Sequence, residues 1–310
     1  MKKIDLITGF LGAGKTSFIR KYAEYLISQG QKICILENDF GAINIDRVLF
    51  KELEEKGCDI EMVIGGDGYE AHRRRFKTKL IAMGMKDYDR ILIEPSGVFD
   101  ADEFFDVLYE EPLDQWYSIG SVITIVDAGL DENLSHQSEY MLASQAADAG
   151  IIVFSKSEGK SAEDIRKVLS HVNSSLARFN CKREIKERNT LAKPWSELDD
   201  ADFRKIIRAE YVHSDMMKLP LDRQNEYSSV FYFDIEIPQS EIESRVRSVL
   251  MSAECGNVIR VKGFVKTADG FIEVNADRHE IKTASVNTER ACLIIIGEKL
   301  VQSEIDKLIK

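Results

Sequence analysis

Residues 9–17 read GFLGAGKTS and fit the pattern GxxxxGK[ST], with an apolar run before them and a helical pattern after them. Backbone N–H groups of such a loop curl around phosphate oxygens, and the dipole of the following helix favours their negative charge. Lys15 places a positive charge near the outer phosphates, and the hydroxyl of Thr16 is a ligand for Mg²⁺. We therefore predict a nucleotide-phosphate site formed by Gly9, Gly12, Ala13, Gly14, Lys15, Thr16 and Ser17.

Short β-branched runs alternate with helical patterns through the first half of the chain. Several of the runs are almost wholly apolar, as expected for strands covered on both faces. The pattern predicts strands at 4–8, 32–38, 59–64, 90–95, 121–128 and 150–156, with helices after Lys15, Tyr69, Ala101, Ser135 and Ser161. This order indicates an α/β fold, a mostly parallel sheet flanked by helices.

The second half has a different organisation, so we expect two domains. Residues 1–180 form the predicted nucleotide-binding domain, and the charged stretch 181–225 is expected to be a linker or peripheral segment. Residues 226–310 predict a smaller α+β C-terminal domain. Its expected elements are a strand at 230–237, a helix from Pro238 to about Ala253, four strands near Val258, Phe271, Ile281 and Leu293, and a final helix near Ser303.

Composition excludes several functions. The net charge of −11 argues against broad binding to nucleic acid or to an anionic membrane. No apolar run approaches the roughly 20 residues that span a bilayer, and the first residues fit a strand better than a signal peptide. The five cysteines are far apart and contain no CxxC pair, so we expect small buried residues, neither disulfides nor a closed zinc site. These features favour the cytoplasm.

Two strand ends carry carboxylates. ILIEPSG, residues 91–97, ends an apolar strand with Glu94 and continues into a turn with Gly97. Glu94 is a candidate for holding Mg²⁺ directly or through water, and the N–H of Gly97 for approaching a γ-phosphate. ENDFGAINID, residues 37–46, offers Asp39 for the same ion. A plain strand end and an ordinary solvated turn remain the alternatives for the two stretches.

VFSKSE, residues 153–158, is an apolar run that ends in Lys156 and Glu158. A carboxylate there can accept hydrogen bonds from N1–H and the 2-amino group of guanine, while the lysine stem covers the base. Adenine has no such donors, so a buried carboxylate would disfavour it. The pattern predicts base recognition by Ser155, Lys156 and Glu158, with guanine preferred.

Taken in order, these motifs resemble those of the CobW-type P-loop GTPases, the CobW/HypB/UreG family. GFLGAGKTS resembles the family phosphate loop, ENDFG its NEFG-like switch, EPSG its ETTG-like element and SKSE its base-recognition motif. RVKGFVKTADGFIEV and LIIIGEKL resemble the CobW C-terminal domain. The resemblance covers nearly all of the chain, and it implies a P-loop NTPase fold.

The chain departs from the family pattern in two places. The usual [NT]KxD is Ser155-Lys156-Ser157-Glu158, and the expected GCxCC is Gly65-Gly66-Asp67-Gly68-Tyr69, which has no cysteine. Without thiolates zinc is not expected at this loop. Glu37, Asp67 and His72 are a weak second-metal set, and solvated side chains are the simpler interpretation. The following Arg73, Arg74 and Arg75 are interpreted as a solvated helix face, with contact to phosphate or to an acidic partner as the alternative.

The resemblance implies hydrolysis of GTP to GDP with Mg²⁺, for which Lys15, Asp39 and Glu94 are the candidate catalytic residues. We expect turnover to be slow because no arginine finger is assigned in the chain. It also implies a switch that delivers a metal or metallocofactor, such as a corrinoid, to a client metalloprotein or cofactor-dependent enzyme, and it suggests a nucleotide-dependent homodimer. Two alternatives stay open: a P-loop kinase that uses ATP, and a nucleotide-binding scaffold that does not hydrolyse.

Overall fold

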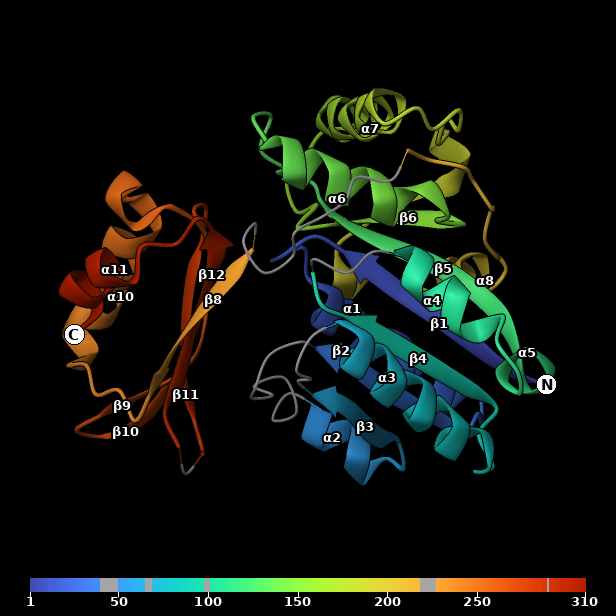
Figure 1. Cartoon of the computed structure of the whole chain (residues 1–310), viewed down its shortest axis with the longest axis horizontal. Helices are drawn as coiled ribbons and strands as arrows, with labels where there is room; N and C mark the ends of the chain where they lie inside the picture. The colour runs from blue at the N-terminus through green and yellow to red at the C-terminus, as the bar shows by residue number, and fades with distance from the viewer. Residues whose placement is uncertain (40–49, 65–68, 98–100, 218–226, 289) are drawn as a thin grey trace. The chain divides into compact units, whose positions relative to one another are not determined.

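A seven-stranded parallel sheet is the framework of the N-terminal unit in the computed structural model (Figure 1). The structure describes residues 1–39, 50–64, 69–97, 101–217, 227–288 and 290–310. They form two units, Met1–Leu219 and Pro220–Lys310. The strand order is β3-β2-β4-β1-β5-β6-β7. The strands are β1 Lys2–Gly9, β2 Ile33–Asp39, β3 Asp59–Ile64, β4 Arg90–Pro95, β5 Tyr117–Asp127, β6 Ile151–Ser155 and β7 Thr190–Ala192.

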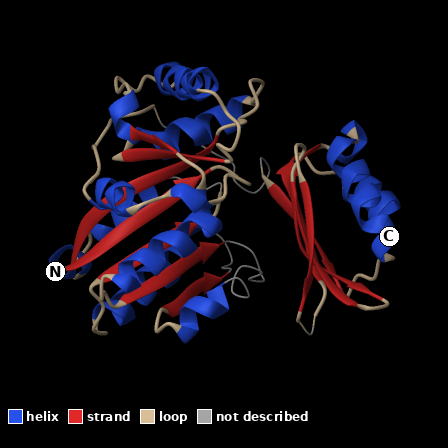
Figure 2. Cartoon of the chain, turned by 180° about the vertical axis from the view of Figure 1, so that it is seen from behind, coloured by secondary structure: helices blue, strands red, loops and turns tan. Residues whose placement is uncertain are grey.

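Helices cover both faces of this sheet (Figure 2). One face packs against α1 (Lys15–Ser28), α2 (Lys51–Glu55) and α8 (Asp200–Ile207). The other packs against α3 (Tyr69–Gly84), α4 (Ala101–Leu108) and α5 (Leu113–Trp116), and α6 (His136–Ala147) lies against β1. The longest of these helices, α7 (Ala162–Arg178), packs on α6 and begins after a capping box formed by Ser161 and Asp164. The expected α/β fold is confirmed.

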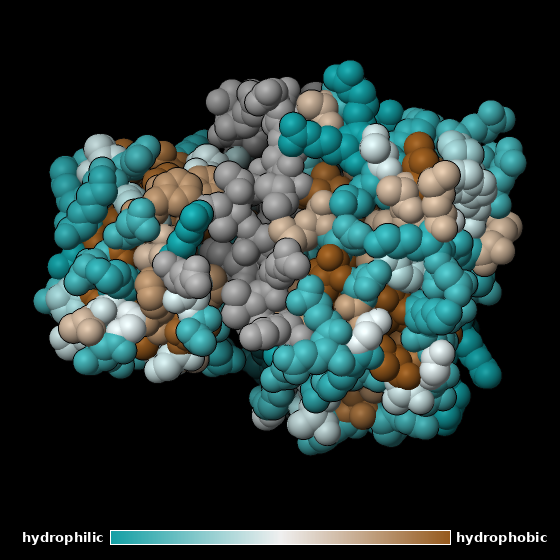
Figure 3. Space-filling view, turned by 90° about the horizontal axis from the view of Figure 1, so that it is seen from below, coloured by the Kyte–Doolittle hydropathy of each residue, from teal (hydrophilic) through white to brown (hydrophobic). Residues whose placement is uncertain are grey.

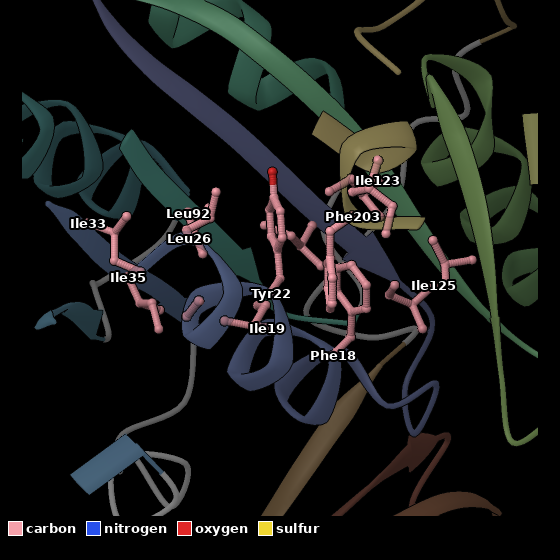
Figure 4. Packing of buried hydrophobic residues seen from close by; sticks show 14 of the residues in the cluster. Phe18, Ile19, Tyr22, Leu26, Ile33, Ile35, Leu92, Ile123, Ile125 and Phe203 are labelled. Carbon is pink, nitrogen blue, oxygen red and sulfur yellow. The ribbon is translucent and has the colours of Figure 1, made fainter. Parts of the chain in front are cut away.

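Alternation along the strands decides which side chain faces which helix. In β2, Ile35 lies in the core on the α1 face, whereas Cys34 and Leu36 lie in the core on the α3 face. Figure 4 shows the core on the α1 face, where the ring of Tyr22 lies among Phe18, Ile19 and Phe203. By the same alternation, successive polar residues at a strand end lie on opposite faces of the sheet. Those on the α1 face lie on the same side as the phosphate loop.

A buried ion pair connects β1 and β4 in the middle of the sheet. Arg90 of β4 donates from Nη1 to both carboxylate oxygens of Asp5 in β1, at 2.7 Å each. Tyr22 and the backbone N–H of Ser121 donate to the same carboxylate at 2.8 Å. Burial, and next the charge of Asp5, raise the pKa of Tyr22 well above its usual value. Because these partners of Asp5 are all donors, its buried charge is compensated.

The C-terminal unit is a five-stranded antiparallel sheet in the order β11-β10-β9-β12-β8. Its strands are β8 Ser228–Phe233, β9 Asn257–Thr267, β10 Gly270–Ala276, β11 Ile281–Val286 and β12 Cys292–Glu298. Among its described residues, α10 (Gln239–Met251) and α11 (Gln302–Ile309) both lie on one face of the sheet (Figure 2). The predicted α+β domain is confirmed, with the first strand ending earlier than expected, at Phe233.

Residues 181–217 are the described part of the stretch interpreted as a linker or peripheral segment. Within this range β7 pairs with β6, and α8 packs its Phe203 and Ile206 into the core beside α1. Arg183 also donates to the backbone carbonyls of Ala146 and Ala147 at the end of α6, and of Ala149 just after it. The described part of this segment is therefore integral to the first unit. Few apolar residues mark it in the sequence because its buried positions are spaced between charged ones.

The described residues on the face drawn in Figure 3 are mainly hydrophilic. On the face seen in Figure 3, hydrophobic side chains reach the surface in small groups among hydrophilic ones. All five cysteines are free and buried, as predicted. No helix in the described ranges has the length and apolar character needed to cross a bilayer.

Candidate nucleotide site

The phosphate loop leaves β1 and enters α1 through a glycine in a left-handed conformation. Gly14 has φ of 90° and is the N-cap of α1, a geometry that a side chain at this position would strain. Lys15 is only 7% exposed and donates from Nζ to the carbonyl of Gly9 at 2.9 Å. Its ammonium group thus lies within the loop, beside the N-terminus of the helix. This arrangement suits an anion with several phosphate groups.

The next residue joins the helix to a neighbouring strand. Thr16 Oγ1 donates to Glu94 Oε1 at 2.8 Å, and Glu94 lies at the end of β4, 8% exposed. Glu37 of β2 stands directly beside Glu94 in register and is 4% exposed. A hydroxyl and carboxylates are the hard oxygen ligands that Mg²⁺ takes, so these residues fit the ion. Of the predicted Mg²⁺ set, Thr16 and Glu94 meet; Asp39 ends β2, and its side chain lies outside the description.

Gly97, in the turn after β4, also lies close to the phosphate loop. A Cβ atom at this position would lie 2.8 Å from Leu11 N and 2.9 Å from Leu11 Cα, so only glycine fits. Gln145 of α6 donates from Nε2 to the carbonyl of Gly97 at 2.9 Å. In turn, the carbonyl of Gln145 accepts a hydrogen bond from Thr124 of β5 at 2.6 Å. Gly97 is therefore held against the loop by a chain of buried contacts.

The predicted base-recognition residues lie at the end of β6, next to the loop. Ser155 is buried, and its Cβ lies 3.6 Å from the position a Cβ would take on Gly14. Lys156 has a positive φ of 49°, and its Nζ lies 2.7 Å from Asp127 Oδ2 at the end of β5. Glu158 follows in an exposed turn. The structure therefore brings Ser155 close to the phosphate loop and leaves Glu158 exposed.

The interpretation of His72 as a solvated side chain is wrong. His72 is 0% exposed, and its Nε2 lies 2.7 Å from Oδ1 of Asn38. Glu37 is also buried, and Asp67 lies outside the described residues. Within the described ranges no three His, Cys, Asp or Glu side chains gather as a metal site. The packing of α3 on the sheet carries His72 into the interior.

The three consecutive arginines have different surroundings in the structure. Arg73 forms an ion pair with Glu110, which also pairs with Lys77. Arg74 and Arg75 are exposed, which is in accord with a solvated helix face. Glu110, the partner of Arg73, lies just beyond the end of α4.

Three further residues of the site were missed. Asp127 could have been found by the rule used for Glu94, since it too ends an apolar strand. Gln145 has no local signal, because only packing brings α6 to Gly97. Trp195 lies 4.0 Å from the Cβ position of Gly14, and its ring centroid is 5.6 Å from that of Phe18.

Comparison with known families decides the relationship. The model of the CobW/HypB/UreG nucleotide-binding domain matches residues 3–186. The chain belongs to this family. The CobW/HypB/UreG match spans the phosphate loop, Glu94, Gly97 and the 155–158 segment, so the strand ends described above are those of a family nucleotide-binding domain.

Curated relatives in the CobW/HypB/UreG family extend beyond that domain. The chain is 24% identical to the zinc chaperone CobW of Pseudomonas aeruginosa over 97% of this chain and 89% of the relative. It is 26% identical to the zinc chaperone YjiA of Escherichia coli, over 84% and 81% of the two chains. The solved structure of Zn(II)-bound YjiA GTPase from E. coli aligns with 100% of this chain and 99% of that one, at 21% identity and a TM-score of 0.38.

Proposed function

We propose that this chain is a Mg²⁺-dependent GTP-binding protein that hydrolyses GTP to GDP slowly and acts as a switch in the delivery of a metal or metallocofactor to a client. One observation carries the proposal: Thr16 of the phosphate loop meets Glu94 at the strand end, where Gly97 also packs against the loop. This is the placement needed by a protein that distinguishes a triphosphate from a diphosphate.

Each residue has a role in this proposal. Lys15 and the loop N–H groups bind the β- and γ-phosphates. Thr16, Glu94 and Asp39 would hold Mg²⁺, which supplies positive charge to the phosphates when bound. Gly97 directs its N–H to the γ-phosphate, and Asp39 or Glu94 orients the attacking water. Glu158 accepts the guanine donors, and Lys156, held by Asp127, covers the base.

The nature of the client is inferred from the names of the relatives and from the loop at 65–69. The relatives are named zinc chaperones, and the relative from Schizosaccharomyces pombe is named a zinc-regulated GTPase metalloprotein activator. With GGDGY in place of the cysteine motif, we favour remodelling of a client metalloenzyme, or of an enzyme that carries a cofactor such as a corrinoid, over direct carriage of zinc by this loop. A nucleotide-dependent homodimer and a cytoplasmic location, in keeping with five free thiols, complete the proposal.

Nucleotide competition tests this function. GTP, GDP and ATP compete for a fluorescent guanine nucleotide, and phosphate release is followed for the wild type and Lys15→Ala. We expect both guanine nucleotides to displace the probe, ATP to fail, and Lys15→Ala to abolish phosphate release. Preference for ATP would favour the kinase, and guanine binding without Lys15-dependent release would favour the scaffold.

A further inference from the structure

Asn38 stands at a junction of three structural elements. It is the second-last residue of β2 and is 0% exposed. Its backbone carbonyl accepts the N–H of Ser96, the residue between Glu94–Pro95 and Gly97, at 3.0 Å. Its side-chain oxygen contacts His72 Nε2, in the first turn of α3, at 2.7 Å. One residue therefore connects the end of β2, the turn after β4 and the start of α3.

The junction lies on the sheet face opposite the phosphate loop. Glu37 and Glu94 alternate with Leu36 and Ile93, which lie in the α3-facing core, so both carboxylates point to the α1 face. Asn38 has the opposite parity to Glu37 and points to α3. Movement of this strand end therefore moves the carboxylate side of the site and the α3 side together.

His72 has the donor that Asn38 Oδ1 needs. A carbonyl oxygen only accepts, so the hydrogen lies on Nε2 of the imidazole. Both side chains are 0% exposed, so removal of one partner leaves the other without this hydrogen bond in a place that water does not reach. Phe76, Leu80 and Met83 of α3 are buried in the same core on this side of the sheet.

We propose that His72 is a positioning residue that couples α3 to the two strand ends, through Asn38, and so sets the place of Ser96 and Gly97 beside the phosphate loop. The proposal rests on the nucleotide-binding function above and adds a residue to it. In this proposal His72 acts through Asn38 on the turn to which the proposed function assigns the distinction between GTP and GDP.

The test compares His72→Leu, which removes the donor, with His72→Gln, whose amide N–H restores it. A matched control is Tyr117→Phe, since the Tyr117 hydroxyl donates to the carbonyl of Leu80 at 2.7 Å, a buried contact at the other end of α3. Affinities for GDP and for a non-hydrolysable GTP analogue are measured for each variant, together with thermal midpoints.

We expect His72→Leu to lower the affinity for the GTP analogue about tenfold, the equivalent of roughly 1.4 kcal/mol. Its affinity for GDP should stay close to that of the wild type. His72→Gln regains most of the loss, and Tyr117→Phe lowers only the thermal midpoint. Equal weakening of both nucleotides, or no recovery in His72→Gln, would overturn the proposal. If His72→Leu does not fold, Asn38→Ser takes its place.

Hydrogen exchange of the nucleotide-free protein separates this proposal from the function on which it rests. We expect faster exchange in the peptide containing Ser96 in His72→Leu, but not in Tyr117→Phe. A wild type that binds no guanine nucleotide would contradict the proposed function while this measurement still tests the junction. Unchanged exchange at Ser96 would overturn the role of His72.

Discussion

The hydroxyl of Thr16 donates to Oε1 of Glu94 over 2.8 Å, so the first turn of α1 and the end of β4 meet at one point. This point is where a divalent ion would be shared by the helix and the strand. We expect Thr16→Ala and Glu94→Gln each to remove the gain in GTP-analogue affinity that Mg²⁺ gives, on the order of tenfold. Titration at several Mg²⁺ concentrations measures it.

Thr78→Ala is the control for the first prediction, because the Thr78 hydroxyl donates to the carbonyl of Arg74 on the exposed side of α3. A Mg²⁺ dependence retained in full by Thr16→Ala would remove this residue from the ion site.

Gly97→Ala is predicted to impair the response to a triphosphate. The new methyl group would lie 2.7 Å from Leu11 Cδ2 and 2.8 Å from Leu11 N, so the turn has to move away from the phosphate loop. Loss of one N–H donor costs on the order of 100-fold in hydrolysis, whereas GDP affinity stays near the wild-type value. Single-turnover phosphate release and GDP binding measure the two effects.

Gly30→Ala controls for general destabilisation in that experiment. Gly30 has φ of 76° but no neighbour within 4 Å of its Cβ position, and it follows the far end of α1. Hydrolysis by Gly97→Ala at the rate of Gly30→Ala would show that the close approach to Leu11 has no part in catalysis.

Glu158→Gln is predicted to change base preference. The amide can donate to the 2-oxo group of xanthine, but it loses the second acceptor that guanine N1–H and the 2-amino group need. We expect GDP affinity to fall on the order of 100-fold and XDP to bind better than GDP. Competition with a fluorescent nucleotide measures the relative affinities for GDP and XDP. Glu163→Gln, on the exposed face of α7, is the matched control. An unchanged preference for GDP would exclude Glu158 from the base site.

Asp148 predicts a pH dependence of stability. Burial raises the pKa of this carboxyl from 3.8 to about 6, although it accepts the N–H of Ser214 at 2.9 Å. Because the folded state holds the proton more tightly, the free energy of unfolding falls as pH rises from about 4 to 6, by up to about 3 kcal/mol. Asp148→Asn should lose this dependence and be more stable than the wild type at pH 7.

Urea unfolding at pH 4, 5, 6 and 7 measures the effect of Asp148, with the exposed Asp200→Asn as control. The amide introduced by Asp148→Asn retains an oxygen for the Ser214 N–H. Lower stability of this variant at pH 7 would therefore mean that the charge of Asp148 is favourable in the folded protein.

Strong local patterns predicted most of the fold. The strands at 59–64 and 90–95 have the predicted bounds because their apolar runs stop at polar or glycine-rich stretches. β7 was missed because it has three residues, of which only Leu191 is buried. α8 carried a usable signal, since Asp199 and Asp202 form a capping box like that of Ser161 and Asp164 at the start of α7.

The site was predicted where residues meet at strand ends and missed where packing alone decides. Thr16 was assigned from the phosphate-loop motif and Glu94 from its place at the end of an apolar strand, and the structure brings the two side chains together. His72 precedes three arginines, so its neighbours in the sequence indicate the surface. Yet His72, Phe76 and Leu80 recur at helical spacing, and that periodicity is the signal for its burial.

The contact of Arg183 with the end of α6 has a consequence for dividing the chain. Its guanidinium supplies donors to carbonyls that the helix leaves open, and the same segment continues into β7 and α8. A fragment cut at residue 180 would expose those carbonyls together with the apolar surface that Phe203 and Ile206 cover. Autonomous folding of the nucleotide-binding half therefore requires the chain through the 211–214 segment, which Asp148 anchors from the other side.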